Sequence, residues 1–231
     1  SGNSHSNNTA IGYESMKGTT TGNKNVAVGT SSLSASTTSI GNTATGYHAL
    51  KDVTTGGYNV SMGYLALANA DGAENSNTAL GAFSAMDMDN DGSIENTYVG
   101  IYAGMGGTGL VTNNTVVGGY AFRRIGDNNA TYNTAMGKFS MGAVWAGASN
   151  YNTAIGGATL NGAMNGAHYN TALGYAALRS ITTGDNNIGI GSAGGLNITE
   201  GSSNIAIGYE CGNDMTTTSN TVLIGYRAGY E

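Results

Sequence analysis

The sequence predicts an all-β repeat β-solenoid or β-roll of about thirteen coils, each 17–19 residues long with two short strands. Three observations predict this fold. A five-residue motif, Asn-[Thr/Val/Ile]-small-apolar-Gly, recurs along the whole chain. Successive motif glycines lie 17 to 19 residues apart. The composition combines 39 glycines with no proline. Regularly spaced glycines indicate repeats rather than disorder, so we expect residues 1–231 to form a single continuous repeat domain.

The closing glycine of the motif marks each coil. Thirteen copies end at Gly12, Gly29, Gly46, Gly63, Gly81, Gly100, Gly118, Gly137, Gly156, Gly174, Gly191, Gly208 and Gly225. The last copy, Asn-Thr-Val-Leu-Ile-Gly, has one extra residue when Asn220 is taken as its opening asparagine. Stacked coils must return the chain to the same place on every turn, whereas linkers between independent domains vary in length. The narrow spacing therefore favours stacked coils.

The motif predicts the first strand of each coil. Its second position is β-branched in every copy, and its fourth position is usually apolar. These two positions share one face of a strand because side chains alternate. We expect this face to point inward and to form the core. A threonine column that points inward argues against ice binding, which uses regular hydroxyls on an exposed surface.

A second strand and a turn complete each coil. A small residue followed by a large one recurs after the motif glycine, as in Ser32-Leu33 and Ala49-Leu50, and a turn rich in Gly, Asn and Thr follows. The last three coils replace the large residue by Gly195, Gly212 and Gly229. This change predicts either a taper that fits the first coil of another chain or a thinner core.

The opening asparagine of the motif predicts a ladder along the stack. It is Asn8, Asn25, Asn42, Asn59, Asn77, Asn96, Asn114, Asn133, Asn152, Asn170, Asn187, Asn204 and Asn220 in the thirteen copies. Amide side chains in such a ladder bond from coil to coil. With strands about 4.8 Å apart, thirteen coils give a rod roughly 60 Å long. Small residues make the coil thin, which favours association of several chains.

Composition and charge exclude several classes of function. The eight Lys and Arg residues are scattered and the net charge is −6, so nucleic acid is a poor partner. No 18-residue apolar run predicts a membrane span. Ser, His and Asp occur without a nucleophile elbow or a triad signature, so we expect no enzyme. We interpret Cys211, the only cysteine, as a small residue at a repeat position.

One segment carries a metal-binding pattern. Asp87, Asp89, Asp91, Ser93 and Glu95 follow the alternating carboxylates and central glycine of a calcium loop of EF-hand type. The carbonyl of Ser93 would supply a backbone ligand. Position twelve of this loop type carries Glu but is Tyr98 here, so Glu95 would replace the missing ligand. Four acids so close together repel one another unless a cation neutralises them. We therefore predict Ca²⁺ at this loop, with a solvated polar loop as the alternative.

Aromatic residues suggest a packing ladder or a surface for sugars. Six tyrosines directly follow a motif glycine, namely Tyr13, Tyr47, Tyr64, Tyr175, Tyr209 and Tyr226. Packing between coils is the favoured interpretation, and a carbohydrate-binding face is the alternative. Trp145, in a turn segment, is the best single candidate for an exposed contact.

Two runs carry a resemblance to known fibre proteins. They are NTATGYHAL, from Asn42 to Leu50, and NTALGYAAL, from Asn170 to Leu178. These runs resemble the repeat region of phage and bacterial tail-fibre proteins, which often precedes an intramolecular chaperone of the endosialidase type. They also resemble the β-roll head repeats of trimeric autotransporter adhesins. The resemblance covers the whole chain and implies a homotrimer outside the cell or on a virion surface.

We therefore expect an extracellular structural or adhesive fibre segment, of tail-fibre or adhesin type, that binds a receptor or a cell-surface glycan. One alternative is a filament subunit that stacks end to end, because neither end of the repeat has a capping helix or a charge cluster. A second alternative is an ice- or surface-binding solenoid.

Overall fold

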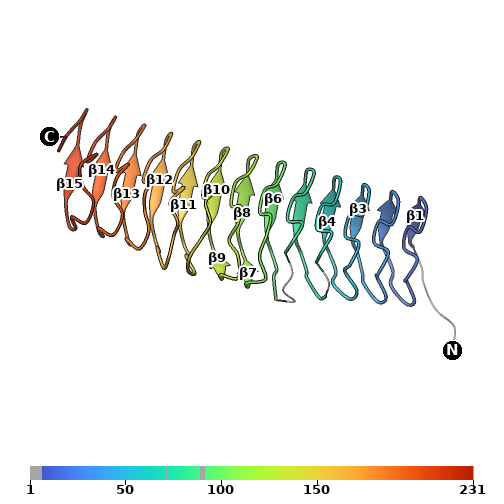
Figure 1. The fold of residues 1–231 in the computed structure, drawn as a ribbon. Helices are drawn as coiled ribbons and strands as arrows, with labels where there is room; N and C mark the ends of the chain where they lie inside the picture. Colours follow the sequence, from blue (N-terminus) through green and yellow to red (C-terminus); the bar gives the residue numbers. More distant parts are fainter. Residues whose placement is uncertain (1–6, 71, 89–91, 231) are drawn as a thin grey trace.

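The chain is a parallel β-solenoid whose coils stack in a row, with the first and last coils at opposite ends (Figure 1). The structure is a computed structural model and describes residues 7–70, 72–88 and 92–230. It contains strands, turns and no helix over these residues. The all-β solenoid predicted from the repeat is confirmed.

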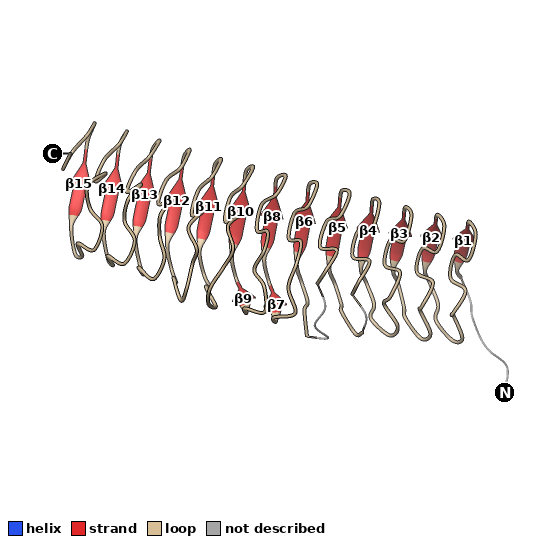
Figure 2. Ribbon diagram, viewed as in Figure 1, coloured by secondary structure: helices blue, strands red, loops and turns tan. Residues whose placement is uncertain are grey.

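One sheet runs through all thirteen coils, with one three-residue strand from each coil. Its strands are β1 (Thr9–Ile11), β2 (Val26–Val28), β3 (Thr43–Thr45), β4 (Val60–Met62), β5 (Thr78–Leu80), β6 (Thr97–Val99), β8 (Thr115–Val117), β10 (Thr134–Met136), β11 (Thr153–Ile155), β12 (Thr171–Leu173), β13 (Ile188–Ile190), β14 (Ile205–Ile207) and β15 (Val222–Ile224). Figure 2 shows these strands as a single row. All neighbours are parallel, and equivalent motif positions are paired, as in Ala135 with Ala154.

The second strand of each coil is short or replaced by turns. Regular pairing away from the main sheet is limited to β7 (Val111–Thr112) with β9 (Ala130–Thr131) among the described residues. The other coils remain joined by individual backbone hydrogen bonds between turns. For example, the N–H of Leu33 donates to the carbonyl of Ala49 at 2.9 Å.

The orientation of the main strands reverses the sequence prediction. The third motif position is fully buried, as at Ala27, Ala135 and Ala206. The second and fourth positions face outward, as shown by Met62, which is 47% exposed, and Leu173, which is 46% exposed. The prediction that these two positions form the core was wrong. The core is narrow enough that alanine fills its share of the space, and larger residues enter it from the turns.

Left-handed backbone conformations allow the turns to deliver these larger residues. The second and fourth residues after most motif glycines have positive φ, as does the residue before most motif asparagines. The fourth residue is often a buried leucine, such as Leu50 (φ 51°) or Leu178 (φ 47°). A left-handed non-glycine residue costs roughly 1–2 kcal/mol, whereas full burial of a leucine contributes roughly 1.5–3 kcal/mol. Burial therefore offsets the backbone strain.

Large and small residues compensate for each other within the core. Tyr98 occupies the usual alanine position and is fully buried, and Gly104 occupies the usual leucine position opposite it. A Cβ atom on Gly104 would lie 2.0 Å from the Tyr98 ring. Burial raises the pKa of the Tyr98 phenol far above its usual value, so this side chain stays neutral.

The same compensation explains the glycines of the last coils. A Cβ on Gly195 would approach Leu178 and Ile198, and a Cβ on Gly212 would lie 2.5 Å from Met215. A Cβ on Gly229 would likewise lie 2.5 Å from Leu223 Cδ1. Neighbouring side chains already occupy the volume, so the core does not become thinner at these glycines.

The asparagine ladder is present and links every pair of adjacent coils. From Asn25 to Asn204, each ladder asparagine donates its backbone N–H to the Oδ1 atom of the preceding one, at 2.8 to 3.1 Å. Each Nδ2 also donates to a carbonyl three residues before the next ladder position, as from Asn133 to Ser149 at 3.0 Å. The ladder residues are buried, so these bonds satisfy groups that have lost water.

The last coil departs from the predicted register. β15 pairs Val222 with Ile205, which places Thr221 in the ladder position. The N–H of Thr221 donates to Oδ1 of Asn204 at 3.1 Å. Asn220 lies one residue earlier, at an exposed corner with φ 58°. Its assignment to the ladder was wrong, and the last coil has no extra residue.

Candidate functional site

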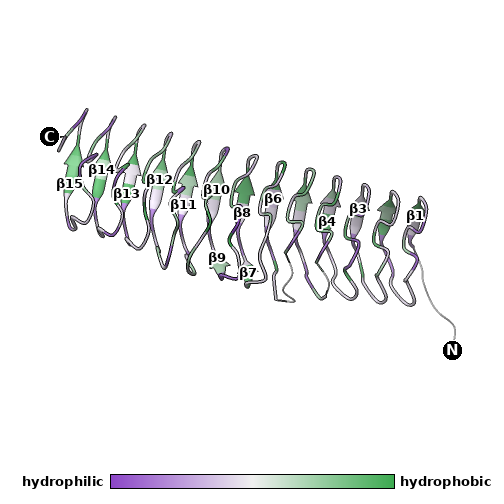
Figure 3. Ribbon diagram, in the orientation of Figure 1, coloured by the Kyte–Doolittle hydropathy of each residue, from purple (hydrophilic) through white to green (hydrophobic). Residues whose placement is uncertain are grey.

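The outward face of the main sheet is the most extended surface feature. The second and fourth motif positions form two outward columns along the thirteen strands. Every residue in these columns is Thr, Val, Ile, Leu or Met, and none is charged. The strands are drawn mostly in white and green in Figure 3. Large apolar side chains stay exposed at both ends and in the middle, including Val222 at 62% and Met136 at 39%. Soluble monomers rarely expose large apolar patches, and this uncharged face carries exposed Val, Ile, Leu and Met beside its threonines along the whole stack.

A ladder of aromatic rings borders this face just after the motif glycines. Its six rings are Tyr47, Tyr64, Phe83, Tyr102, Tyr120 and Phe139, with centroids 4.8 to 5.4 Å apart. Tyr132, Tyr151 and Tyr169 form a second ladder before the motif asparagines, with neighbouring rings within 5° of parallel. Most rings stack or tilt against their neighbours, and Tyr64 meets Phe83 edge to face, so few ring faces are free for a sugar. The geometry supports packing as their main role.

Trp145 lies in the core and is not an exposed contact. Its side chain is 3% exposed and meets Phe122 edge to face, with ring centroids 5.1 Å apart. The best single candidate that the sequence offered for an exposed contact is therefore a core residue. In most coils the seventh residue after the motif glycine points into the core. In this coil and the next, the buried residue is the eighth, namely Trp145 and Met164.

The predicted calcium loop is described only in part. Asp89 and Asp91 lie outside the described residues. Asp87 accepts a hydrogen bond from Asn69 Nδ2 at 2.7 Å, and Glu95 is exposed at a corner with φ 59°. Ser93 is buried, and its carbonyl accepts a hydrogen bond from Asn77 Nδ2 at 2.9 Å. The structure thus gives the carbonyl expected to bind the cation a role in the asparagine ladder. The described residues include no cluster of three or more His, Cys, Asp or Glu that could hold a metal ion.

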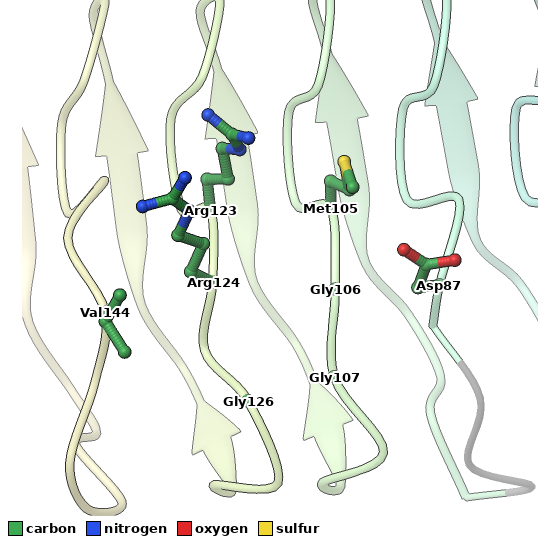
Figure 4. A pocket seen from close by; sticks show the side chains of 8 residues that line it. All are labelled: Asp87, Met105, Gly106, Gly107, Arg123, Arg124, Gly126 and Val144. Carbon is green, nitrogen blue, oxygen red and sulfur yellow. The ribbon is translucent and has the colours of Figure 1, made fainter.

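A cavity of about 470 Å³ lies in the middle of the solenoid, away from the sheet face (Figure 4). It crosses four consecutive coils. Its lining residues are Asp87, Met105, Gly106, Gly107, Arg123, Arg124, Gly126 and Val144. No sequence pattern singled out this cavity. The signal is the missing side chain at Gly106 between coils that carry Asp87 and Arg124 at the same position, and it appears only when the coils are aligned.

A second cavity, of about 210 Å³, lies at the first coil and is lined by Asn8, Ala10, Ser15, Met16 and Thr19. Equivalent positions in later coils are covered by the coil before them. At the other end, β15 pairs only with β14. Both terminal strands of the main sheet therefore present a free edge within the described residues.

Cys211 occupies a core column that elsewhere holds alanine, serine, glycine or threonine. It is buried, and its Sγ atom donates to the carbonyl of Leu223 at 3.2 Å. Burial raises the pKa of the Cys211 thiol, so the thiolate form is disfavoured. This geometry agrees with its interpretation as a small residue of the repeat.

Over the described ranges, no helix has the length and apolar character needed to cross a membrane. Comparisons with protein-family models, curated proteins and solved structures found no match to this chain.

Proposed function

We propose that the chain is a non-catalytic segment of an extracellular or virion-surface fibre, and that its sheet face is the interface of a homotrimer. The observation that carries this proposal is the uncharged face of Thr, Val, Ile, Leu and Met that runs along all thirteen strands. A fibre needs length with little material, and a stack of thin coils provides it. The resemblance to tail-fibre and trimeric adhesin repeats supports three copies and a surface location.

The dimensions of the face suit a subunit interface. Thirteen strands about 4.8 Å apart, each about 10 Å long, give roughly 600 Å² per chain before the bordering aromatic ladders are included. A standard interface buries about 800 Å² per partner, so the bordering aromatic ladders must contribute area as well. An identical copy fits best because the same uncharged columns then meet along the whole length, without an unpaired charge at any coil.

Two threonines of one coil provide a matched test. Thr171 is exposed on strand β12, and Thr183 is exposed in the turn of the same coil away from the sheet. We expect Thr171→Lys to bring three ammonium groups together and to weaken assembly by at least about tenfold, a loss of 1.4 kcal/mol or more. We expect Thr183→Lys to assemble like the parent. Equal sedimentation of both variants and the parent at every concentration would contradict the proposed interface.

The outward threonine column favours one other function. Eight of the thirteen second positions are threonine, and these side chains do not point into the core. The adjacent column mixes Ile, Val, Thr, Leu and Met, so the face lacks a uniform hydroxyl lattice. Ice binding is therefore the second candidate, behind the fibre interface. Measurable thermal hysteresis that is abolished by Thr171→Lys would favour it over the fibre interface.

A further inference from the structure

The central cavity forms at Gly106, where one coil lacks a side chain that its neighbours have. Gly106 and Gly107 occupy the sixth and seventh positions after their motif glycine. The equivalent residues are Asp87 and Met88 in the preceding coil and Arg124 and Ile125 in the following coil. A Cβ atom on Gly106 would meet no atom within 4 Å. The result is a notch with charged side chains on both sides (Figure 4).

Arg123 and Arg124 make one side of the notch cationic. The chain contains only eight Lys and Arg, yet this adjacent pair lines a single cavity. Neither side chain forms an ion pair with a described residue. The guanidinium of Arg123 lies 5.5 Å and 5.2 Å from the ring centroids of Tyr102 and Tyr120, and its buried Nε has no hydrogen-bond partner. These ring contacts hold the guanidinium in place without using its N–H donors.

The backbone at Arg124 is also unusual for this solenoid. Arg124 has φ 64°, and no other described non-glycine residue is left-handed at the sixth position after a motif glycine. Strained residues persist where the surrounding structure holds them, and they gather at ligand-binding positions. In Figure 4 the side chains of Arg123 and Arg124 extend from the same stretch of backbone, with Met105 and Asp87 on the coils beside them.

The lining selects a ligand with three chemical features. Two arginines favour a planar carboxylate, which accepts paired N–H donors. Asp87 is an acceptor for hydroxyl groups and disfavours a second anionic group. Met105 and Val144 supply apolar surface for a C–H face. The backbones of Asp87 and Arg124 lie two coils apart, about 10 Å along the stack. The Arg124 side chain extends toward the coil of Val144 (Figure 4), which leaves room for one or two sugar rings.

We propose that this notch binds an acidic saccharide of the uronic acid class, with its carboxylate on Arg123 and Arg124 and its hydroxyls on Asp87. The site deepens the proposed fibre function, because it supplies a receptor contact. None of the lining residues belongs to a strand of the main sheet. The notch therefore lies outside the sheet columns, and Arg123 is the lining residue that contacts the bordering rings of Tyr102 and Tyr120.

Matched probes and variants test this site on the full 231-residue chain. Methyl β-D-glucuronide is compared with methyl β-D-glucoside, which has a hydroxymethyl group in place of the carboxylate, and with acetate. Binding is followed by saturation-transfer NMR at millimolar concentrations. The variants are Arg124→Gln and Arg123→Gln, and the control is Arg179→Gln. Arg179 is exposed and occupies the coil position of Arg123 in a coil without the notch.

We expect the glucuronide to bind at least about tenfold more tightly than the glucoside and acetate. Arg124→Gln and Arg123→Gln should each weaken its binding by about tenfold or more, and Arg179→Gln should leave it unchanged. Absence of glucuronide binding, equal affinity for the glucoside or acetate, or unchanged binding by Arg124→Gln would overturn the proposal. The mass of the parent chain in solution is measured alongside. A trimer that does not bind the glucuronide would refute this site and leave the fibre role standing.

Discussion

Each motif glycine except the last lies where a side chain would collide with the next coil. Gly208 and Gly225 both have φ near +135°, so their backbone strain is similar. A Cβ on Gly208 would lie 2.3 Å from the carbonyl oxygen of Gly225. Gly225 has no coil beyond it in the structure, and the nearest atom to its Cβ would be 3.9 Å away. The glycine of the motif is therefore required by the close approach of coils as well as by its backbone conformation.

These two glycines give a matched prediction. Gly208→Ala should destabilise the chain by about 3 kcal/mol or more, because strain and a backbone clash add. Gly225→Ala should cost only about 1–2 kcal/mol, from strain alone. Urea denaturation followed by circular dichroism measures both. Equal losses for the two variants would show that coil contact does not impose the glycine.

The ladder asparagines differ from the other asparagines of the chain in their burial and bonding. Asn133 is buried and bonds to Asn114, Ser149 and Asn152, whereas Asn220 is exposed outside the ladder. Asn133→Ala should cost about 2–5 kcal/mol, because it leaves the N–H of Asn152 and the carbonyl of Ser149 buried without partners. Asn220→Ala should cost less than about 1 kcal/mol. Thermal denaturation separates the two variants, and a larger loss at Asn220 would contradict the register of the last coil.

Calcium binding is still a prediction for the segment from Asp87 to Glu95. We expect calcium to raise the melting temperature of the chain, since a cation that binds only the folded state stabilises it. Asp89→Ala should remove most of this effect, because few carboxylates are present. Asp52→Ala, in a different coil, is the control. A calorimetric titration with no heat and no change in melting temperature would eliminate the site.

At the scale of the coil, the sequence predicted the period but not the orientation of the strand. The motif alternates Thr or Val, Ala, and Ile, so both faces are compatible with burial in a thin solenoid. Leu50 and its equivalents decide the orientation, because their left-handed backbone directs them into the core opposite the alanines. Hydrophobic periodicity alone does not report this conformation. The sequence did not place Trp145 in the core because the turn of its coil has one more residue than most, and this extra residue brings the indole inward.

Exchange of volume between core columns is a property of the whole coil. Tyr98→Ala should cost about 3–5 kcal/mol by leaving a cavity, and Gly104→Leu should be at least as harmful because its side chain collides with Tyr98. The double variant restores the Ala and Leu pair of most other coils, so its loss should be well below the sum of the two. A double-mutant cycle measures this coupling. Additive losses would contradict the proposed compensation.

At the scale of the molecule, the repeat predicted the stack and most of the asparagine ladder, because each rests on strictly spaced residues. The notch at Arg123 and Arg124 is lined by four aligned coils, so no single motif predicts it. The free edges of β1 and β15 leave end-to-end filaments as the alternative assembly. Long rods in negative-stain images would favour filaments, whereas short, discrete particles at high concentration would favour a closed assembly.

The mass of the unmodified chain in solution tests the central claim most directly. If the sheet face joins three copies, sedimentation equilibrium at concentrations well above micromolar should give about 70 kDa, three times the 23.2 kDa of one chain. A closed trimer should keep this mass as the concentration rises, because its apolar faces are already covered. A stable species at the mass of a single chain over the same concentrations would contradict the account.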